Sequence, residues 1–117
     1  MILYGIPNCD TVRKARKHLE QNNLPYQFHD FKKEGVTLER LQTWLQQHPI
    51  TTLVNKRSST WRQLSETQKE ALISHGDLSI LIESPTLIKR PVLQTENTLN
   101  PQTIIGFKES EYQKLNH

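Results

Sequence analysis

Residues 1–17 read Met-Ile-Leu-Tyr-Gly-Ile-Pro-Asn-Cys-Asp-Thr-Val-Arg-Lys-Ala-Arg-Lys, and this stretch decides the fold. An apolar run over residues 2–4 predicts a short buried strand, which stops at a turn over residues 5–8. A basic, amphipathic pattern follows and predicts a helix. Cys9 therefore lies where a strand gives way to a helix N-terminus, with its unpaired N–H groups and partial positive charge. Both features favour a thiolate, and so a reactive cysteine.

The predicted helix has a clear buried face. Its apolar residues recur at helical spacing, namely Val12, Ala15 and Leu19. We expect Asp10 or Thr11 to cap its first turn, and the basic residues on its other faces to be solvated. A second strand is predicted over residues 26–29, after Pro25. A strand, a helix and a strand in this order predict a parallel pair joined by a right-handed crossover.

The middle of the chain, residues 32–85, is predicted to be helical. Thr37 is expected to cap a helix that runs to about residue 48. Ser65 and Gln68 form a capping-box pattern that opens a second helix through Ile73. Between these helices lies a basic stretch over residues 55–62, and a last short helix ends at Ser84-Pro85.

The final third of the chain returns to strands. Residues 86–93 are typical of a strand with Pro91 inside it, and this proline marks an edge, a bulge or a cis bond. A turn over residues 97–102 and a short strand over residues 103–106 complete a predicted hairpin. A terminal helix is expected over residues 108–115.

Length, charge and residue content limit the classes of function that we expect for this chain. With 117 residues the chain is expected to form a single domain, and its formal net charge of +3 is mild. Such a charge makes nucleic acid one candidate partner and small anionic metabolites another. Of these we expect a small substrate, with no direct contact to nucleic acid and no membrane. It has no long apolar segment and no secretory leader, so we expect a cytoplasmic location. The five histidines show no metal-ligand spacing, and a single cysteine can form a disulfide only with an outside thiol.

Four segments together resemble one known family, the ArsC/Spx arsenate-reductase-like family, and are most similar to its YffB branch. The segments are Tyr4-Gly-Ile-Pro-Asn-Cys-Asp-Thr-Val-Arg13, Leu53-Val-Asn-Lys-Arg-Ser58, Ile88-Lys-Arg-Pro-Val92 and Gly106-Phe107. The resemblance implies an α/β protein with a thioredoxin-like fold (βαβ followed by ββα). Residues 1–31 and 86–117 would form the thioredoxin-like part of one ArsC-like domain over residues 1–117, with residues 32–85 as a helical insertion.

The resemblance also implies site residues. Cys9 would be the nucleophile, Arg90 an anion ligand and Pro91 a cis-proline whose neighbouring backbone can pair with a peptide-like thiol. Lys56 or Arg57 would take the place of a family arginine whose position varies. The residues themselves add Arg13, one helical turn after Cys9, as a further cation near the thiolate.

Several positions depart from the arsenate reductases of this family. Those proteins have a histidine at the position of Gly5 and arginines at the positions of Asn55 and Phe107. An arsenate dianion needs several charge-assisted donors, so these differences favour a general thiol reductase. Spx regulators often carry a second cysteine where this chain has Val12, which excludes a two-cysteine switch within this chain.

We therefore expect a monomeric, glutathione-dependent thiol-disulfide reductase without a bound cofactor, with glutathione as co-substrate and a small disulfide or oxyanion as substrate. Three alternatives stay open. The chain could be a Spx-like regulator that binds the transcription machinery without turnover, a true arsenate reductase, or a family member that has lost its activity. In the last case Cys9 would be a small apolar residue in the core. Lys56 and Arg57 could equally belong to a solvated loop.

Overall fold

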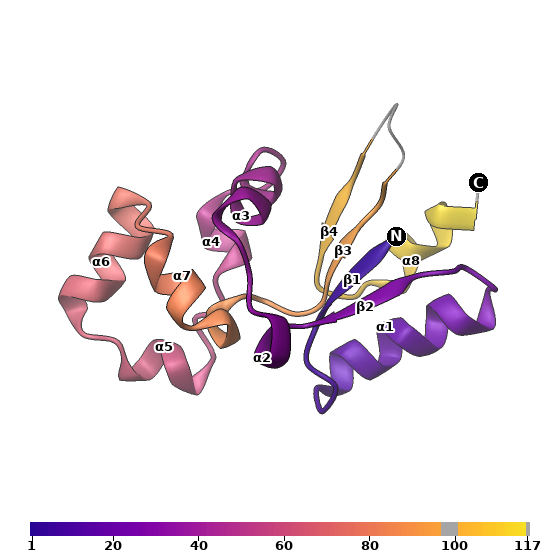
Figure 1. Ribbon diagram of the computed structural model, residues 1–117, viewed down its shortest axis with the longest axis horizontal. Helices are drawn as coiled ribbons and strands as arrows, with labels where there is room; N and C mark the ends of the chain where they lie inside the picture. The colour runs from indigo at the N-terminus through magenta and orange to yellow at the C-terminus, as the bar shows by residue number, and fades with distance from the viewer. Residues whose placement is uncertain (97–100, 117) are drawn as a thin grey trace. The chain divides into compact units, whose positions relative to one another are not determined.

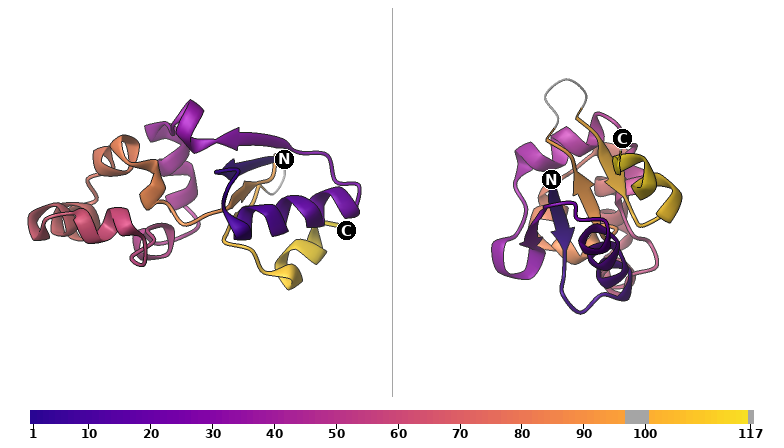
Figure 2. Two further views of the ribbon diagram at one scale, coloured as in Figure 1. Left: turned by 90° about the horizontal axis from the view of Figure 1, so that it is seen from below. Right: turned by 90° about the vertical axis from the view of Figure 1, so that its right-hand side faces the viewer.

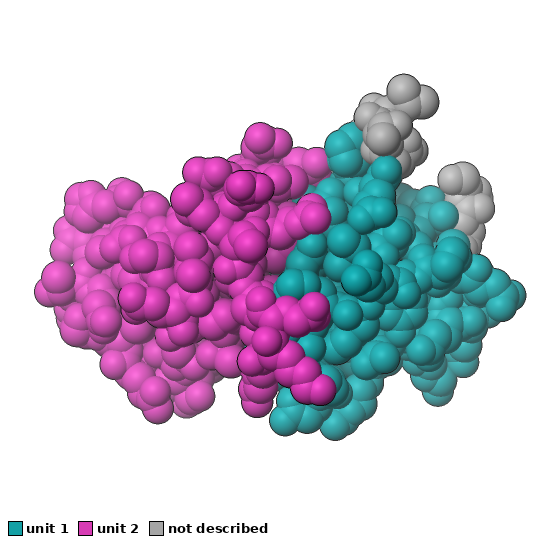
Figure 3. Space-filling view, viewed as in Figure 1, with its two compact units in different colours: residues 1–30, 90–117 teal, residues 31–89 magenta. Residues whose placement is uncertain are grey.

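The computed structural model describes residues 1–96 and 101–116 (Figure 1). The chain divides into two compact units, which Figure 3 colours separately. Unit 1 consists of residues 1–30 and 90–117, and unit 2 consists of residues 31–89. Residues 97–100 of the predicted hairpin turn lie outside the described residues.

The described part of unit 1 is built on a four-stranded sheet in the order β2-β1-β3-β4. Its strands are β1 (Ile2–Gly5), β2 (Gln27–Asp30), β3 (Val92–Gln94) and β4 (Thr103–Ile105). The first two strands are parallel, as the strand-helix-strand order predicts, whereas β1 with β3 and β3 with β4 are antiparallel. The sheet and its helices confirm the predicted α/β, thioredoxin-like class.

Two helices share one core with the sheet of unit 1. These are α1 (Asp10–Gln21) and α8 (Glu109–Gln113), and the right-hand view of Figure 2 shows both on the same side of the strands. One row of paired residues crosses all four strands, namely Phe28, Leu3, Leu93 and Ile104. Ala15 and Leu19 of α1 and Tyr112 of α8 pack in the same cluster as this row. The buried face predicted for the first helix is therefore its docking face.

Unit 2 consists of short helices. They are α2 (Phe31–Glu34), α3 (Leu38–Leu45), α4 (Ile50–Leu53), α5 (Ser59–Gln63), α6 (Glu66–His75), α7 (Ser79–Glu83) and the 3₁₀ turn η1 (Pro85–Leu87). The predicted caps are present, because the Thr37 hydroxyl accepts from the Arg40 N–H at 3.2 Å and Ser65 forms the capping box with Gln68. The turn η1 contacts α2, α5 and α7, so it lies near the centre of this unit.

Two predictions for secondary structure are wrong. Residues 86–93 do not form one strand: the chain passes through η1, a single bridge at Ile88 and a cis bond before β3 begins at Val92. The terminal helix also ends early, at Gln113, and a 3₁₀ turn (Lys114–Asn116) follows.

Candidate active site

Cys9 is itself the N-cap residue of α1, with extended backbone angles (φ −101°, ψ 125°). Its N–H donates to the Ile6 carbonyl at 3.3 Å, and its own carbonyl accepts the first helical hydrogen bond from the Arg13 N–H at 2.9 Å. The expectation that Asp10 or Thr11 caps this helix is wrong, since both lie inside it. The half-buried thiol therefore stands at the positive end of a helix of 12 residues.

The turn that carries Cys9 is fixed by a close contact between β1 and α1. A Cβ atom placed on Gly5 would lie 2.7 Å from Cγ2 of Val12, a distance that real Cβ atoms essentially never show. Glycine at this position thus allows the end of β1 to pack directly on the first turn of α1. A side chain at position 5 would therefore force the Val12 side chain, or the first turn of α1 that carries it, to shift.

Arg13 lies on α1 one turn after Cys9, but its charge already has a partner. Its Nη1 is 2.6 Å from Oδ1 of Asp10, and both side chains are exposed. Asp10 stands in the first turn, where the helix dipole also favours a carboxylate. The positive charge of Arg13 is therefore shared with Asp10.

Arg90 and Pro91 lie immediately before β3, and the peptide bond that joins them is cis. Tyr4 of β1 pairs with Val92 in antiparallel register, so the end of β1 and the start of β3 are neighbours. The Cys9 turn follows β1 and Arg90-Pro91 precedes β3; both segments therefore leave the sheet at the same end. The Pro91 carbonyl is held by the Gly106 N–H at 2.8 Å, and Arg90 is half-buried.

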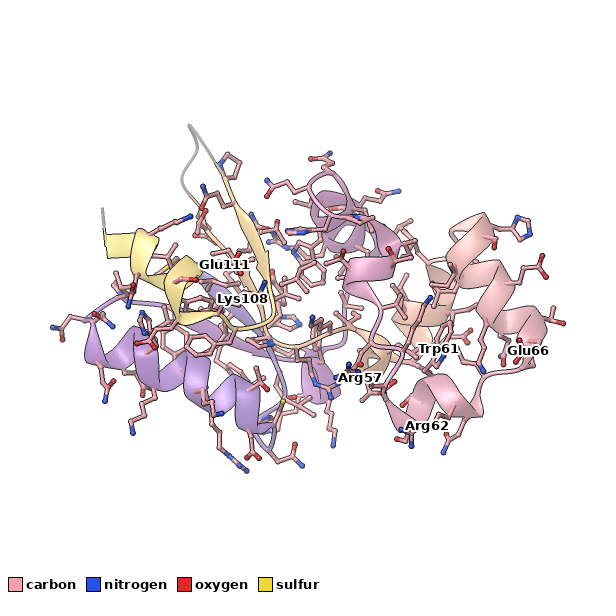
Figure 4. The ribbon with its side chains drawn as sticks, turned by 180° about the vertical axis from the view of Figure 1, so that it is seen from behind. Arg57, Trp61, Arg62, Glu66, Lys108 and Glu111 are labelled. Atoms are coloured by element: carbon pink, nitrogen blue, oxygen red, sulfur yellow. The ribbon has the colours of Figure 1, made fainter. Side chains whose placement is uncertain are left out.

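Lys56 and Arg57 belong to unit 2, on the turn between α4 and α5. Both side chains are exposed, and Nζ of Lys56 lies 5.7 Å from the ring centre of Trp61. Figure 4 shows Arg57, Trp61 and Arg62 on α5 and the turn before it. Lys56 and Arg57 line a pocket of about 460 Å³ together with Lys89 and two threonines. Lys89 was not predicted as a site residue.

Phe107 has a structural role in unit 1. Its ring lies 4.7 Å from that of Tyr112 and 5.9 Å from that of His18, between α1 and α8. Phe107 stands at the position where the resemblance places an arginine in arsenate reductases, and here it is part of an aromatic cluster. No group of three or more His, Cys, Asp or Glu side chains within residues 1–96 and 101–116 is placed to hold a metal ion.

Comparison with known proteins identifies the family. The model of the ArsC family matches residues 4–115. The chain belongs to the ArsC family. The resemblance found in the four sequence segments is thereby confirmed.

The helices that the structure describes are all too short or too polar to span a membrane.

Two curated relatives of this ArsC-family chain show what it resembles in sequence. An uncharacterised protein of Haemophilus influenzae is 45% identical over 111 residues, which are 95% of this chain and 94% of that protein. The global transcriptional regulator Spx 2 of Bacillus anthracis is 27% identical over 117 residues, covering 98% of this chain and 86% of its own.

Two solved structures extend the comparison. The YffB protein has a TM-score of 0.88 and 37% identity, covering 99% of this chain and 98% of its own. An arsenate reductase (ArsC) related protein from Brucella melitensis has a TM-score of 0.70 and 35% identity, covering 97% of this chain and 91% of its own. The chain is therefore similar in sequence to a regulator, and similar in both sequence and fold to an arsenate reductase related protein.

Proposed function

We propose that this chain is a glutathione-dependent thiol-disulfide reductase with Cys9 as its single nucleophile. The observation that carries the proposal is the place of Cys9 as the N-cap of α1, at the end of the helix where the dipole is positive. Membership of the ArsC family, whose solved members include an arsenate reductase related protein, supports a thiol oxidoreductase. The cytoplasm, where glutathione keeps thiols reduced, is the compartment in which such a reaction would run.

The proposed reaction has two exchange steps. The Cys9 thiolate attacks the glutathionyl sulfur of a mixed disulfide, so that a Cys9–glutathione disulfide forms and the substrate leaves as a thiolate, which takes up a proton. A second glutathione thiolate then attacks this adduct, which releases the Cys9 thiolate and forms glutathione disulfide. With one cysteine in the sequence, the second thiol must come from solution.

Some of the residues that we propose as ligands of the substrate and of glutathione belong to unit 1, and others belong to unit 2. In unit 1, Arg90 and Pro91 are proposed to bind the substrate at the sheet end that also carries Cys9. Arg13 is a proposed ligand that would have to exchange Asp10 for a carboxylate of glutathione. Lys56 and Arg57 belong to unit 2, and we propose them as ligands for a carboxylate of glutathione.

Arsenate reduction is a weaker alternative for reasons of packing. A histidine at position 5, as in the arsenate reductases of the family, cannot fit here unless the Val12 side chain, or the first turn of α1 that carries it, moves away from β1. Phe107 is held in the aromatic cluster of unit 1 and supplies no charge. A Spx-like regulatory role is favoured by the similarity to the Spx 2 regulator, and the experiment below separates it from the reductase.

Mass spectrometry of the intact chain after incubation with glutathione disulfide tests the proposal. We expect one glutathione adduct on Cys9, which reduced glutathione removes, and turnover of a glutathionylated peptide that Cys9→Ser lacks. The Cys9→Ser chain is the matched control, since it keeps a small polar side chain at the helix N-cap. Absence of an adduct under these conditions would contradict the reductase, and binding to RNA polymerase without an adduct would favour the regulator.

A further inference from the structure

The pocket of unit 2 contains far more positive charge than a general thiol site needs. It has a volume of about 460 Å³, and its polar lining consists of Thr51, Thr52, Asn55, Lys56, Arg57 and Lys89. Three of these side chains are cationic, two are hydroxyls and one is an amide. No carboxylate lines the pocket. Concave surfaces lined by one sign of charge concentrate ions of the opposite sign.

Backbone hydrogen bonds place Lys89 beside the α4–α5 turn, although it is distant in sequence. Val54 and Ile88 form an isolated antiparallel bridge. On one side of this bridge the Asn55 N–H donates to the Leu87 carbonyl at 2.8 Å, and on the other side the Lys89 N–H donates to the Leu53 carbonyl at 2.8 Å. The main chain therefore brings the backbone of Lys89 next to the turn that carries Lys56 and Arg57.

The turn itself is also held by its own side chains. The Asn55 Oδ1 accepts from the Arg57 N–H at 3.0 Å, and the Ser58 hydroxyl donates to the Asn55 carbonyl at 2.8 Å. Among the described residues, neither Lys56 nor Arg57 nor Lys89 forms an ion pair. The backbone is thus ordered in advance, while the charges of the pocket are uncompensated.

We propose that this pocket binds a small molecule through a phosphate group. Its donors are a planar guanidinium fork, two ammonium groups and two hydroxyls, and they come from α4, from the following turn and from the segment after η1. A tetrahedral oxyanion with several acceptor oxygens satisfies such a set better than a planar carboxylate does. Three cations also match a phosphate dianion better than a single carboxylate. The volume leaves room for the organic part of the ligand.

The site goes beyond the proposed reductase, because its ligand needs neither a thiol nor Cys9. Lys56 and Arg57 appear in both proposals, so a phosphate ligand would compete with the carboxylate of glutathione for these two side chains. Lys89 belongs to the phosphate site alone, and it is therefore the residue to change.

The test is a titration of the full-length Cys9→Ser chain with inorganic pyrophosphate, followed by the amide NMR signals. We expect saturable shifts confined to residues 51–57 and 89 and their neighbours. Lys89→Gln should weaken binding about tenfold, which corresponds to about 1.4 kcal/mol. Lys108→Gln, which removes an exposed cation from unit 1, is the matched control and should leave the affinity unchanged.

Several outcomes would overturn the phosphate site. The proposal would be wrong if the amide NMR shifts do not saturate, or if they spread over all surface lysines. It would also be wrong if wild type and Lys89→Gln bind pyrophosphate with equal affinity. Equal affinity for tricarballylate, a tricarboxylate, would show that the pocket recognises charge alone. If Lys89→Gln loses its native amide spectrum, Lys56→Gln takes its place, with the fluorescence of the neighbouring Trp61 as the readout.

The experiments can contradict the reductase proposal and the phosphate-site proposal independently of each other. Pyrophosphate binding without a glutathione adduct on wild-type Cys9 would leave the phosphate site standing and contradict the reductase. An adduct that turns over, in a chain that does not bind pyrophosphate, would leave the reductase standing and contradict the phosphate site.

Discussion

Unit 1 holds its candidate nucleophile on regular secondary structure, whereas unit 2 presents its candidate anion ligands on a turn between helices of four and five residues. Cys9 is positioned by a strand, a helix of 12 residues and a glycine that admits no side chain. Lys56 and Arg57 are positioned only through the backbone of their turn, which the Val54–Ile88 bridge and the Asn55 side chain hold, and their charged ends remain exposed.

The difference between the two scaffolds follows from the different geometric requirements of a nucleophile and of an anion ligand. A nucleophile must meet its target atom within a narrow range of distance and direction, and a rigid scaffold provides this. A long cationic side chain acts over several ångströms and can adjust to its ligand, although ordering it costs conformational entropy. Changes that loosen the scaffold should therefore affect unit 1 and its nucleophile first, and changes at caps should affect only the local helices of unit 2.

The largest expected effect comes from the core of unit 1. Leu19→Ala should lower the free energy of unfolding by about 2–5 kcal/mol, because Leu19 is fully buried between α1 and the sheet. Denaturant unfolding measures this loss. Lys17→Ala, at an exposed position of the same helix, should change stability by less than about 0.5 kcal/mol. Equal effects of the two substitutions would show that α1 does not dock through its predicted face.

The contact between Gly5 and Val12 should give the next largest effect. Gly5→Ala should cost about 1–3 kcal/mol of stability, because the new methyl group would overlap Cγ2 of Val12. The rate at which Cys9 is alkylated should change as well, since α1 has to shift. In a Val12→Ala background the same substitution should cost clearly less, which a double-mutant cycle measures. A cost that is the same in both backgrounds would refute the proposed steric cause.

A smaller effect is expected in unit 2, at the start of α6. Ser65→Ala should destabilise the chain by about 1 kcal/mol. It removes the acceptor of the Gln68 N–H (3.1 Å) and leaves the reciprocal bond from the Ser65 N–H to the Gln68 side chain (2.9 Å) unsupported. Ser74→Ala, within the same helix, is the matched control and should be nearly neutral. If both cost the same, the capping box contributes nothing specific.

Local patterns account for the elements that the sequence predicts well. The first helix shows three apolar residues at helical spacing, and the capping box at Ser65 depends on residues only three apart. The parallel pair of β1 and β2 follows from the order strand, helix, strand. In each case the deciding interaction lies within a short window of sequence.

The remaining features depend on contacts between distant segments. The bridge between Val54 and Ile88 gives the chain before β3 a partner in unit 2, so residues 86–93 do not form one strand. The same bridge places Lys89 in the pocket, and no local pattern contains this information. Cys9 was not expected as the cap, because its side chain is not a usual capping group and accepts no capping hydrogen bond.

The smallest expected effect concerns Tyr112, which is fully buried in unit 1. Its ring packs edge-on against Phe107 and His18, while its hydroxyl has no hydrogen-bond partner among the described residues. Tyr112→Phe keeps the ring contacts and removes the unsatisfied group. We therefore expect stability at neutral pH that is unchanged or higher by up to about 1 kcal/mol.

The same substitution should make the chain more resistant to alkali. Burial, with the nearby charge of Glu111 adding to it, raises the pKa of the Tyr112 phenol above its ordinary value. Above a pH of about 10 the unfolded chain releases this proton while the folded chain retains it, so wild-type stability falls as the pH rises. Tyr112→Phe lacks this contribution, and its stability advantage should grow between pH 9 and pH 11, measured by urea unfolding. An advantage that stays constant over this range would show that the phenol ionises equally in both states, and that the aromatic cluster between α1 and α8 admits water.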